Sequence, residues 1–494
     1  MLENELKRYF NYDSFRPGQK EVISSVLEGQ HTIAMLPTGT GKSLCYQLSG
    51  YLLNGPVLVV SPLLSLMQDQ VEQMRMNGEK RVVAINSFLS GDERKRTLAN
   101  LKHYKFIFIS PETLTNTRLM EQIQRLKISL FVIDEAHCIS QWGYDFRPDY
   151  MKLGEVRKNL GDPLTLALTA TATKEVLRDI IQSLRLEQYQ QIIFSVDRPN
   201  IAISVTHIES YREKWDCLYR YVQTLKGAGI IYFSSKKVAE QAAKLLQEKG
   251  IGRVAAYHGG MDQESRILIQ QQFLMNQLDI ICATSAFGMG VNKENIRYVI
   301  HFHMPGQMES YLQEIGRAGR DGKSSVAILL YSPGDEQLAY QLSEAEIPSE
   351  QQFDWLAKMV NDRSEGWTNE PETLQQMGGF TDTSWRMIAE ILFKSSLNKS
   401  MILANLLEYK QHCESRRKVK QEKIAFMTRW VFSKTCRRKQ ILQYFQEKWE
   451  REDSDSCCDQ CGFDPLTLHY VEEKEEGKKV EISWKQRLAD ILLN

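Results

Sequence analysis

The 494-residue sequence lacks any run of about eighteen uncharged apolar residues, the length that a membrane-spanning helix needs. Its first residues, MLENELKRYFNYDSF, contain acids, a lysine and an arginine but no apolar core of a signal peptide. Neither sign of charge is in excess, because Lys plus Arg and Asp plus Glu each number 62. We therefore expect a cytoplasmic protein with no membrane partner, in which any nucleic-acid surface comes from local segregation of basic residues.

Cysteine is also scarce, with nine residues in the chain. Cys45, Cys138, Cys217 and Cys282 are scattered among apolar residues, which is typical of small buried side chains in a reducing compartment. The sequence has no short tandem repeat and no low-complexity tract. With 42% hydrophobic and 25% charged residues it has the composition of a folded protein, and its length predicts roughly three domains.

Short apolar runs alternate with longer amphipathic stretches from about residue 20 to residue 335. The runs occupy residues 57–62, 106–112, 130–135 and 164–172, and then 229–235, 253–260, 279–290 and 298–305. Continuous apolar runs that end in turn signals are typical of parallel strands covered on both faces. Pro199 and Asn200 interrupt the pattern. The sequence therefore predicts an α/β fold with two tandem parallel-sheet domains, 1–200 and 201–340, followed by a mainly helical region.

The segment PTGTGKS, residues 37–43, follows an apolar run and precedes a predicted helix. Small residues let backbone N–H groups surround a phosphate chain, and the helix N-terminus adds positive charge. Lys42 can then reach the terminal phosphates and Ser43 can ligate Mg²⁺. Leu36 stands where the general phosphate-loop pattern has glycine. A chance GKS in a loop is the alternative, and the flanking strand and helix argue against it.

Two further motifs carry charges suited to phosphoryl chemistry. Asp134 and Glu135 end a predicted strand, at the sheet edge where ligands bind in such folds; one carboxylate can hold Mg²⁺ and the other can polarise an attacking water. Arg317 and Arg320 are three residues apart, which puts them on one helical face, and arginines from a second domain can neutralise a transferring phosphoryl group. Alone, each motif is more simply a solvated surface; with the phosphate loop they indicate nucleotide hydrolysis.

The stretch CISQWGYDFRPDY, residues 138–150, gathers Trp142, Tyr144 and Phe146 directly after the carboxylates. A buried strand is the plain interpretation of three alternating aromatics. The interleaved glycine, charges and proline favour a loop instead.

Four cysteines, Cys436, Cys457, Cys458 and Cys461, gather near the end of the chain. Thiolates in a tetrahedral arrangement suit structural Zn²⁺, and one C-x-x-C pair is present. Free thiols in a loose tail are the alternative.

Together these motifs resemble superfamily 2 helicases, and over residues 10–335 they are similar to the RecQ family of ATP-dependent DNA helicases. The shared segments are FRPGQ (15–19), PTGTGKS, SPLLSLMQDQ (61–70), DEAH (134–137), LTATA (168–172), DRPNI (197–201), YHGGM (257–261), ATSAFGMGV (283–291) and QEIGRAGRDG (313–322). The resemblance implies two RecA-like domains with ATP and Mg²⁺ between them, and 3′-to-5′ unwinding of duplex DNA in repair or recombination. A nucleoid-associated cytoplasmic location follows from that role.

The resemblance also implies roles for individual residues. Catalytic roles fall to Lys42, Asp134, Glu135, Arg317 and Arg320; ATP contacts to Arg16, Gln19 (which reads adenine), Thr38, Gly39, Thr40, Gly41, Lys42 and Ser43; and Mg²⁺ ligation to Ser43 and Asp134. In the family, the stretch after DEAH is an aromatic loop that senses single-stranded DNA, with bases stacking on rings at ~1–3 kcal/mol each. Here the coupling residues are His137, Gln141, Trp142, Phe146 and Arg147. Thr40 stands where the family usually has Gly.

The resemblance thins after residue 335. We expect a helical insertion over 341–412, a zinc-binding subdomain over 413–470 and a tail over 471–494. The family's zinc spacing puts its second cysteine at Asp455, so Cys457 is the candidate here and Cys413 or His412 the alternatives. Residues 373–392 fit a helix-turn-helix unit or a plain helical hairpin. The basic run 416–423 fits phosphate contacts or a solvated helix face.

The expected partners are single-stranded and duplex DNA, with single-stranded-DNA-binding or repair proteins as further candidates. Two other functions stay open. One is an RNA helicase or remodeller, because the motor chemistry is the same. The other is an ATP-switched nucleic-acid-binding protein that does not unwind, because the residues after Cys461 are too few for the winged helix that many relatives carry.

Overall fold

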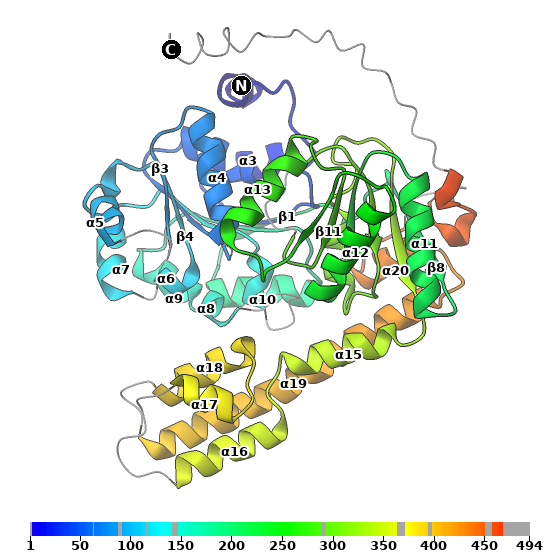
Figure 1. Ribbon diagram of the computed structural model, residues 1–494. Helices are drawn as coiled ribbons and strands as arrows, with labels where there is room; N and C mark the ends of the chain where they lie inside the picture. The colour runs from blue at the N-terminus through cyan, green and yellow to red at the C-terminus, as the bar shows by residue number, and fades with distance from the viewer. Residues whose placement is uncertain are drawn as a thin grey trace.

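Two parallel sheets side by side, with a helical extension beneath them, make up the described chain (Figure 1). The computed structural model describes residues 2–62, 64–86, 91–114, 116–140, 147–287, 293–362, 371–393, 398–449 and 457–467. The predicted fold class, two tandem RecA-like α/β domains followed by a mainly helical region, is confirmed. The expected tail, 471–494, lies outside the described residues.

The first lobe has a seven-stranded sheet in the order β3-β4-β2-β5-β6-β1-β7, and every pairing is parallel. Its strands are β1 (His31–Met35), β2 (Val57–Val60), β3 (Val82–Ile85), β4 (Phe106–Ile109), β5 (Leu130–Ile133), β6 (Thr165–Thr169) and β7 (Tyr189–Ile193). Its helices are α1 (Leu2–Phe10), α2 (Gln19–Leu27), α3 (Lys42–Leu52), α4 (Leu64–Met76), α5 (Gly91–Ala99), α6 (Pro111–Leu114), α7 (Thr117–Gln124), α8 (Pro148–Met151), α9 (Leu153–Asn159) and α10 (Lys174–Leu184). Successive strand residues point to opposite faces and both faces are covered, which explains the continuous apolar runs.

The second lobe has a six-stranded parallel sheet in the order β10-β11-β9-β12-β13-β8. Its strands are β8 (Ile201–His207), β9 (Ala228–Tyr232), β10 (Val254–Tyr257), β11 (Ile280–Ala283), β12 (Ile296–His301) and β13 (Ser325–Tyr331). Its helices are α11 (Tyr211–Thr224), α12 (Lys236–Glu248), α13 (Gln263–Leu274) and α14 (Met308–Ile315). One apolar core runs from the first lobe into the second and on into the C-terminal helices, so the described lobes pack as one body.

The helical extension consists of α15 (Asp335–Ala345), α16 (Glu350–Asn361), α17 (Pro371–Met377), α18 (Asp382–Phe393), α19 (Lys399–Val431) and α20 (Arg437–Tyr444). Helices α16 to α18 pack on the first part of α19 around Leu356, Trp385 and Ile388, whereas its last turns, with Trp430, join the core of the lobes. Figure 1 shows α19 running from this lower module up to the second lobe.

The segment 373–392 forms a helix, a turn at Gly378 and Gly379, and a second helix, as both interpretations of it required. Helix α19 is continuous across residues 412 and 413, where the expected subdomain boundary lies. Within the residues that the structure describes, no helix is long and apolar enough to cross a membrane.

Lowering the pH from 7 to 5 should destabilise the second lobe through His303. Its buried ring accepts a hydrogen bond at Nδ1 from the backbone N–H of Ser234 (3.2 Å), so this nitrogen carries no proton. Burial, with the charge of Lys214 as a second cause, lowers the pKa of His303 to about 3. The unfolded chain binds this proton near pH 6.5, so the stability that the neutral ring contributes is present above that pH and is lost as the pH falls. The loss between pH 7 and 5 is about 2 kcal/mol.

The check is the free energy of unfolding at pH 7 and pH 5 for the wild type and for His303→Asn. The Asn amide oxygen can accept the same hydrogen bond but does not titrate, so the variant should lose about 2 kcal/mol less over this range. An equal loss in both proteins would contradict the assignment.

Candidate active site and metal cluster

The phosphate loop lies between the end of β1 and the start of α3. Gly39 (φ 92°) and Gly41 (φ 75°) are in the left-handed region, which a side chain would strain, and Gly41 directly precedes Lys42, the first residue of α3. Thr40 keeps an ordinary φ, and its hydroxyl donates to the carbonyl of Pro37 (2.8 Å). Threonine in place of the family's glycine is therefore accommodated without backbone strain.

Two residues expected to contact ATP, Gln19 and Arg16, hold the backbone of this loop. The side-chain amide of Gln19 donates to the carbonyls of Thr40 (2.7 Å) and Gly41 (3.1 Å). Gln19 Oε1 accepts from the backbone N–H of Arg16 (2.9 Å), and the Arg16 guanidinium donates to the carbonyl of Gly39 (2.7 Å). These contacts fix the curvature of the loop and keep both side chains beside it.

The carboxylates follow β5 directly. Burial raises the pKa of Asp134, and the nearby charge of Lys42 opposes that shift. Glu135 is buried with φ 49°, a left-handed conformation that costs a non-glycine residue energy and that is concentrated at functional sites. The partly buried carboxylate of Asp134 beside the phosphate-loop lysine, together with the hydroxyl of Ser43, is an oxygen donor set that fits Mg²⁺.

His137 connects this strand end to the next one. Its Nδ1 lies 3.0 Å from Thr169 Oγ1, in the LTATA segment, and 3.4 Å from Glu135 Oε2. Burial, followed by the charge of Lys42, lowers the pKa of His137 to about 3, so the ring is neutral at physiological pH. The DEAH and LTATA segments are thus joined through one imidazole.

Of the expected DNA-coupling residues, His137 and Arg147 lie within the described part of the chain. Arg147 Nη1 donates to the carbonyl of Pro62 (2.6 Å), at the start of the SPLLSLMQDQ segment, and its backbone N–H donates to Cys138 (3.0 Å). Gln141, Trp142 and Phe146 lie outside the described residues. The residues after DEAH are therefore linked to the SPLLSLMQDQ segment, in addition to the link between DEAH and LTATA.

The spacing of the two motif arginines led us to expect them on one face of a helix. This expectation is wrong. Helix α14 ends at Ile315, and Arg317 and Arg320 lie in the turns that follow, where Gly319 has φ 56°. A Cβ atom on Gly39 would lie 2.9 Å from Arg320 Cγ, so this side chain packs directly on the phosphate loop. Burial lowers the pKa of Arg320 to about 9, and the guanidinium groups of Arg317 and Arg198 act in the same direction. Such a concentration of cations fits a polyanionic ligand.

Arg198 is a site residue that the sequence analysis did not identify. Its guanidinium donates to the carbonyls of Thr38 (2.8 Å) in the first lobe and Gly316 (3.2 Å) in the second, and also to Ala318 and Gly319. It therefore bridges the phosphate loop and the arginine turn. The sequence did offer one signal that could have identified Arg198: it lies in the shared DRPNI segment, next to the predicted domain boundary.

The four C-terminal cysteines form one cluster, with all Sγ atoms within 4.8 Å of one another. Cys457 and Cys458 lie against the edge strand β8, where the backbone N–H of Ile203 donates to Cys457 O (3.2 Å). The alternative ligand Cys413 instead packs with Ile347 and Phe353 in a separate apolar cluster. Four converging thiols fit tetrahedral Zn²⁺.

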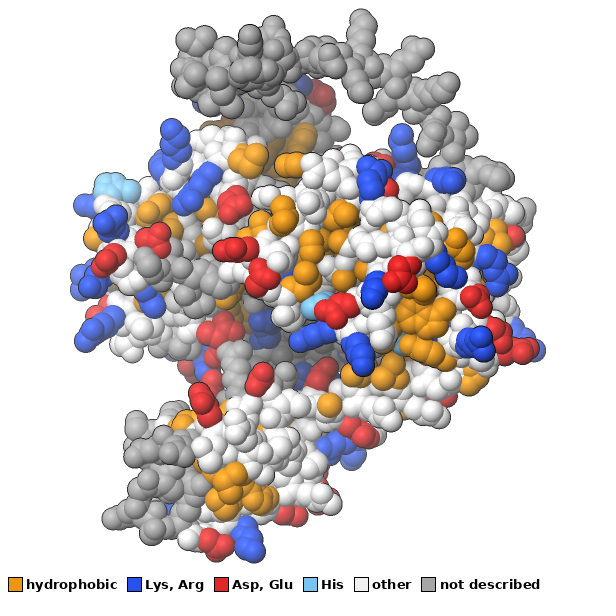
Figure 2. All heavy atoms as spheres, viewed as in Figure 1, with side chains coloured by type: hydrophobic (Ala, Val, Ile, Leu, Met, Phe, Trp, Pro, Cys, Tyr) orange, Lys and Arg blue, Asp and Glu red, His pale blue; other side chains and the backbone are white. Residues whose placement is uncertain are grey.

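The basic run 416–423 makes contacts inside the protein. Arg417 donates to the carbonyl of Pro348 (2.9 Å), Lys420 pairs with Glu346, and Lys423 pairs with Glu309 (2.8 Å). These three cations fasten α19 to neighbouring segments. Figure 2 shows acidic and basic side chains interspersed over the visible face, in keeping with the balanced composition.

A cleft of about 750 Å³ opens at the carboxyl ends of β9, β11 and β12, next to α19. Lys236, Lys420 and Lys423 contribute to its walls, together with Glu314, Glu346, Thr284 and Gln307. The exposed Lys236 and the hydrogen-bonding side chains of this open groove suit contacts to a nucleic-acid backbone, although Lys420 and Lys423 are paired with carboxylates.

The sequence matches three family descriptions: DEAD/DEAH box helicase over residues 16–180, helicase conserved C-terminal domain over 213–322, and RecQ zinc-binding over 397–462. It is 45% identical over 492 residues to the probable ATP-dependent DNA helicase RecS of Bacillus subtilis, covering 99% of this chain and 97% of that relative. It is 36% identical over 458 residues to the ATP-dependent DNA helicase RecQ of Haemophilus influenzae, covering 92% of this chain and 62% of that relative. The chain therefore spans nearly all of the first relative and less than two thirds of the second.

Among solved structures, the fold is similar to that of the Mycobacterium smegmatis helicase Lhr bound to ssDNA and AMP-PNP. The TM-score is 0.57 at 18% identity, over 78% of this chain and 56% of that one. At this identity the likeness concerns the fold alone.

Proposed function

The chain belongs to the RecQ family of ATP-dependent DNA helicases, and from that premise we propose that it unwinds duplex DNA in the 3′-to-5′ direction, in DNA repair or recombination. The residue assignment rests on a contact between the lobes: Arg320 of the second lobe packs on Gly39 in the phosphate loop of the first, and Arg198 of the connecting segment lies beside it. Charge can therefore be delivered from the second lobe to phosphates held by the first.

In this proposal the loop 38–43 holds the triphosphate through its backbone N–H groups, and Lys42 contacts the terminal phosphates. Ser43 and Asp134 would hold Mg²⁺, which would supply charge neutralisation of the phosphate oxygens. Glu135 orients the attacking water and accepts its proton, while Arg317 and Arg320 stabilise charge on the transferred group. Arg16 and Gln19 lie at the loop, within the segment proposed to read adenine.

Single-stranded DNA is proposed to pass along the cleft beside α19 in the second lobe and to contact the loop that carries Gln141, Trp142 and Phe146. The link from His137 to Glu135 and the link from Arg147 to Pro62 support coupling between that loop and hydrolysis. Single-stranded-DNA-binding and repair proteins are the protein partners proposed with this role.

For the domains we propose lobes 1–200 and 201–340, a helical region 341–412, a zinc subdomain 413–470 and a tail 471–494. Because α19 runs through residues 412 and 413, the helical region and the zinc subdomain share one helix. The cluster of four thiols supports one structural Zn²⁺ in the last of these domains.

Arg320→Ala should lower DNA-stimulated turnover about a thousandfold while the affinity for ATP changes little, because the charge acts mainly in the transition state. Steady-state kinetics together with nucleotide-binding titration measure the two effects. Arg178→Ala, which removes an exposed arginine of the first lobe, is the matched control and should behave as the wild type. Parallel losses of binding and turnover would indicate that Arg320 holds the loop instead.

A strand-displacement assay tests the function as a whole. Duplexes with a 3′ tail should be unwound in the presence of ATP and Mg²⁺, and duplexes with a 5′ tail should not. ATP hydrolysis should be stimulated more by single-stranded DNA than by RNA. Stronger stimulation by RNA would favour the RNA helicase, and hydrolysis without displacement would favour the ATP-switched binding protein.

A further inference from the structure

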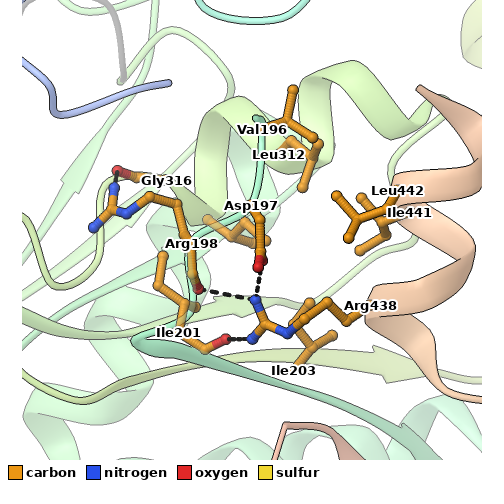
Figure 3. A pocket seen from close by; sticks show the side chains of 11 residues that line it. Val196, Asp197, Arg198, Ile201, Ile203, Leu312, Gly316, Arg438, Ile441 and Leu442 are labelled. Atoms are coloured by element: carbon orange, nitrogen blue, oxygen red, sulfur yellow. Dashed lines mark hydrogen bonds and ion pairs between the residues drawn. The ribbon is translucent and has the colours of Figure 1, made fainter. Parts of the chain in front are cut away.

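The segment that joins the two lobes, residues 196–201, is held by hydrogen bonds from the zinc-bearing part of the chain. The guanidinium of Arg438, in α20, pairs with Asp197 and donates to the carbonyls of Arg198 (3.0 Å) and Ile201 (2.5 Å) (Figure 3). A second contact comes from the residue Glu447, whose carboxylate accepts from the backbone N–H of Val196 (3.0 Å). Three consecutive residues of the connecting segment, Val196, Asp197 and Arg198, are thus bound by the zinc-bearing part.

Apolar side chains shield most of this contact from water, although the Asp197 side chain keeps 15% exposure. Ile201, Ile203, Leu312, Ile441 and Leu442 surround it (Figure 3), and Arg438 itself is 3% exposed. In such surroundings a hydrogen-bonded ion pair is strongly directional, and removing one partner leaves the other buried and uncompensated. The grip therefore fixes the position of the backbone at Asp197 and Arg198.

The side chain of Arg198 leaves this fixed backbone toward the nucleotide site. There it joins the carbonyl of Thr38 to those of Gly316, Ala318 and Gly319. The main chain of residue 198 thus contacts the zinc-bearing part, and its side chain spans the two walls of the proposed ATP site.

We propose that Arg438 is a positioning residue for ATP hydrolysis, acting through Arg198 to align the arginine turn of the second lobe with the phosphate loop of the first. This inference rests on the proposed hydrolytic roles of that site. It gives the zinc-bearing part a function in the motor reaction in addition to any contact with DNA.

The metal cluster determines where Arg438 lies. Cys436 directly precedes α20, and the backbone N–H of Arg437 donates to Cys458 Sγ (3.3 Å). The first turn of α20 is therefore anchored at the thiol cluster, with Arg438 two residues from Cys436. Zinc retention is for this reason a necessary control in the experiment.

The test compares Arg438→Gln, Arg438→Lys and Lys439→Gln, the last being a matched charge removal at the exposed neighbour on the same helix. Arg438→Gln should lower DNA-stimulated kcat about tenfold or more, with KM for ATP changed less than about twofold, because misplacement and not lost binding is the cause. Arg438→Lys should recover part of kcat, and Lys439→Gln should match the wild type. All three should keep one zinc per chain by elemental analysis.

The double variant Arg198→Gln/Arg438→Gln separates positioning from a general structural role. If Arg438 acts through Arg198, the double variant should be no slower than Arg198→Gln alone; multiplied losses would overturn the proposal. Unchanged kcat in Arg438→Gln would overturn it as well.

If Arg438→Gln loses zinc or unfolds, Asp197→Asn decides, because it weakens the same grip from the connecting segment and leaves α20 intact. A kcat loss of about tenfold with zinc retained supports the proposal, and a normal kcat refutes it. The wild type is assayed before any variant. Absence of DNA-stimulated hydrolysis in the wild type would contradict the proposed function itself and not the role of Arg438.

Discussion

Lys42→Ala is expected to abolish DNA-stimulated ATP hydrolysis, with a loss on the order of a thousandfold or more, while DNA binding without nucleotide survives. Lys42 is the first residue of α3, directly after the left-handed Gly41, so its ammonium group starts from a helix N-terminus that already favours anions. It is also the nearby positive charge that opposes the rise in the pKa of Asp134. Its removal therefore takes away a phosphate contact and makes the charged, metal-binding form of Asp134 less favourable.

Hydrolysis rates with and without single-stranded DNA, and DNA affinity by fluorescence anisotropy, measure the two parts of this expectation. Lys95→Ala, at an exposed position of α5, is the matched control and should leave both unchanged. Hydrolysis retained in Lys42→Ala would remove the basis for the whole nucleotide site.

Cys458→Ser should release the zinc and cost most of the stability of the zinc-bearing part. Structural zinc sites in small domains contribute about 10–16 kcal/mol of apparent binding energy, so loss of one buried thiolate is not compensated locally. Cys458 is fully buried and bridges to Ile203 on the edge strand of the second lobe, so the variant should also expose that edge. Elemental analysis, thermal unfolding and limited proteolysis should report zinc loss, a lower Tm and cleavage after α20.

Cys413→Ser is the control, since this thiol lies in a different apolar cluster, and it should keep one zinc per chain. Cys457→Ser tests the ligand that the family spacing left open and should behave as Cys458→Ser. Zinc retained in Cys458→Ser would contradict the four-thiol site.

The sequence predicted the parts of the fold whose pattern is local. Strands such as β2 and β5 are continuous apolar runs because both of their faces are buried. Every residue of these two strands is buried in the structure. The strands β3, β8 and β13 lie outside the predicted apolar runs although most of their residues are buried. The edge strand β7 was not predicted either, since its residues Tyr189–Ile193 are partly exposed and mostly polar or mixed in character. An edge strand in contact with solvent has no reason to keep the apolar run that identifies a central one.

The site was predictable where a motif carries its own geometry and not where tertiary packing supplies it. Gly39 and Gly41 require their backbone conformation, so the loop could be located from sequence alone. Arg317 and Arg320 were expected on a helix because their spacing fits one, but the chain leaves the helix at Gly316 and turns again at Gly319. The bridging role of Arg198 depends on carbonyls more than a hundred residues away, and no local pattern encodes that.

Helix α19 has a mechanical consequence. At about 1.5 Å per residue, its 33 residues span about 50 Å, with the last turns embedded in the core of the lobes and the first turns carrying α16 to α18. The ion pair between Lys423 and Glu309 holds it near the embedded end, in the position of a fulcrum. From Lys423 to the far end at Lys399 the helix is about 36 Å long, so a tilt of about 5° at Lys423 would displace that end by about 3 Å. Because the part of α19 before Lys423 is about three times as long as the part after it, a displacement of the embedded end would be enlarged about threefold at the helical module, as by a lever arm.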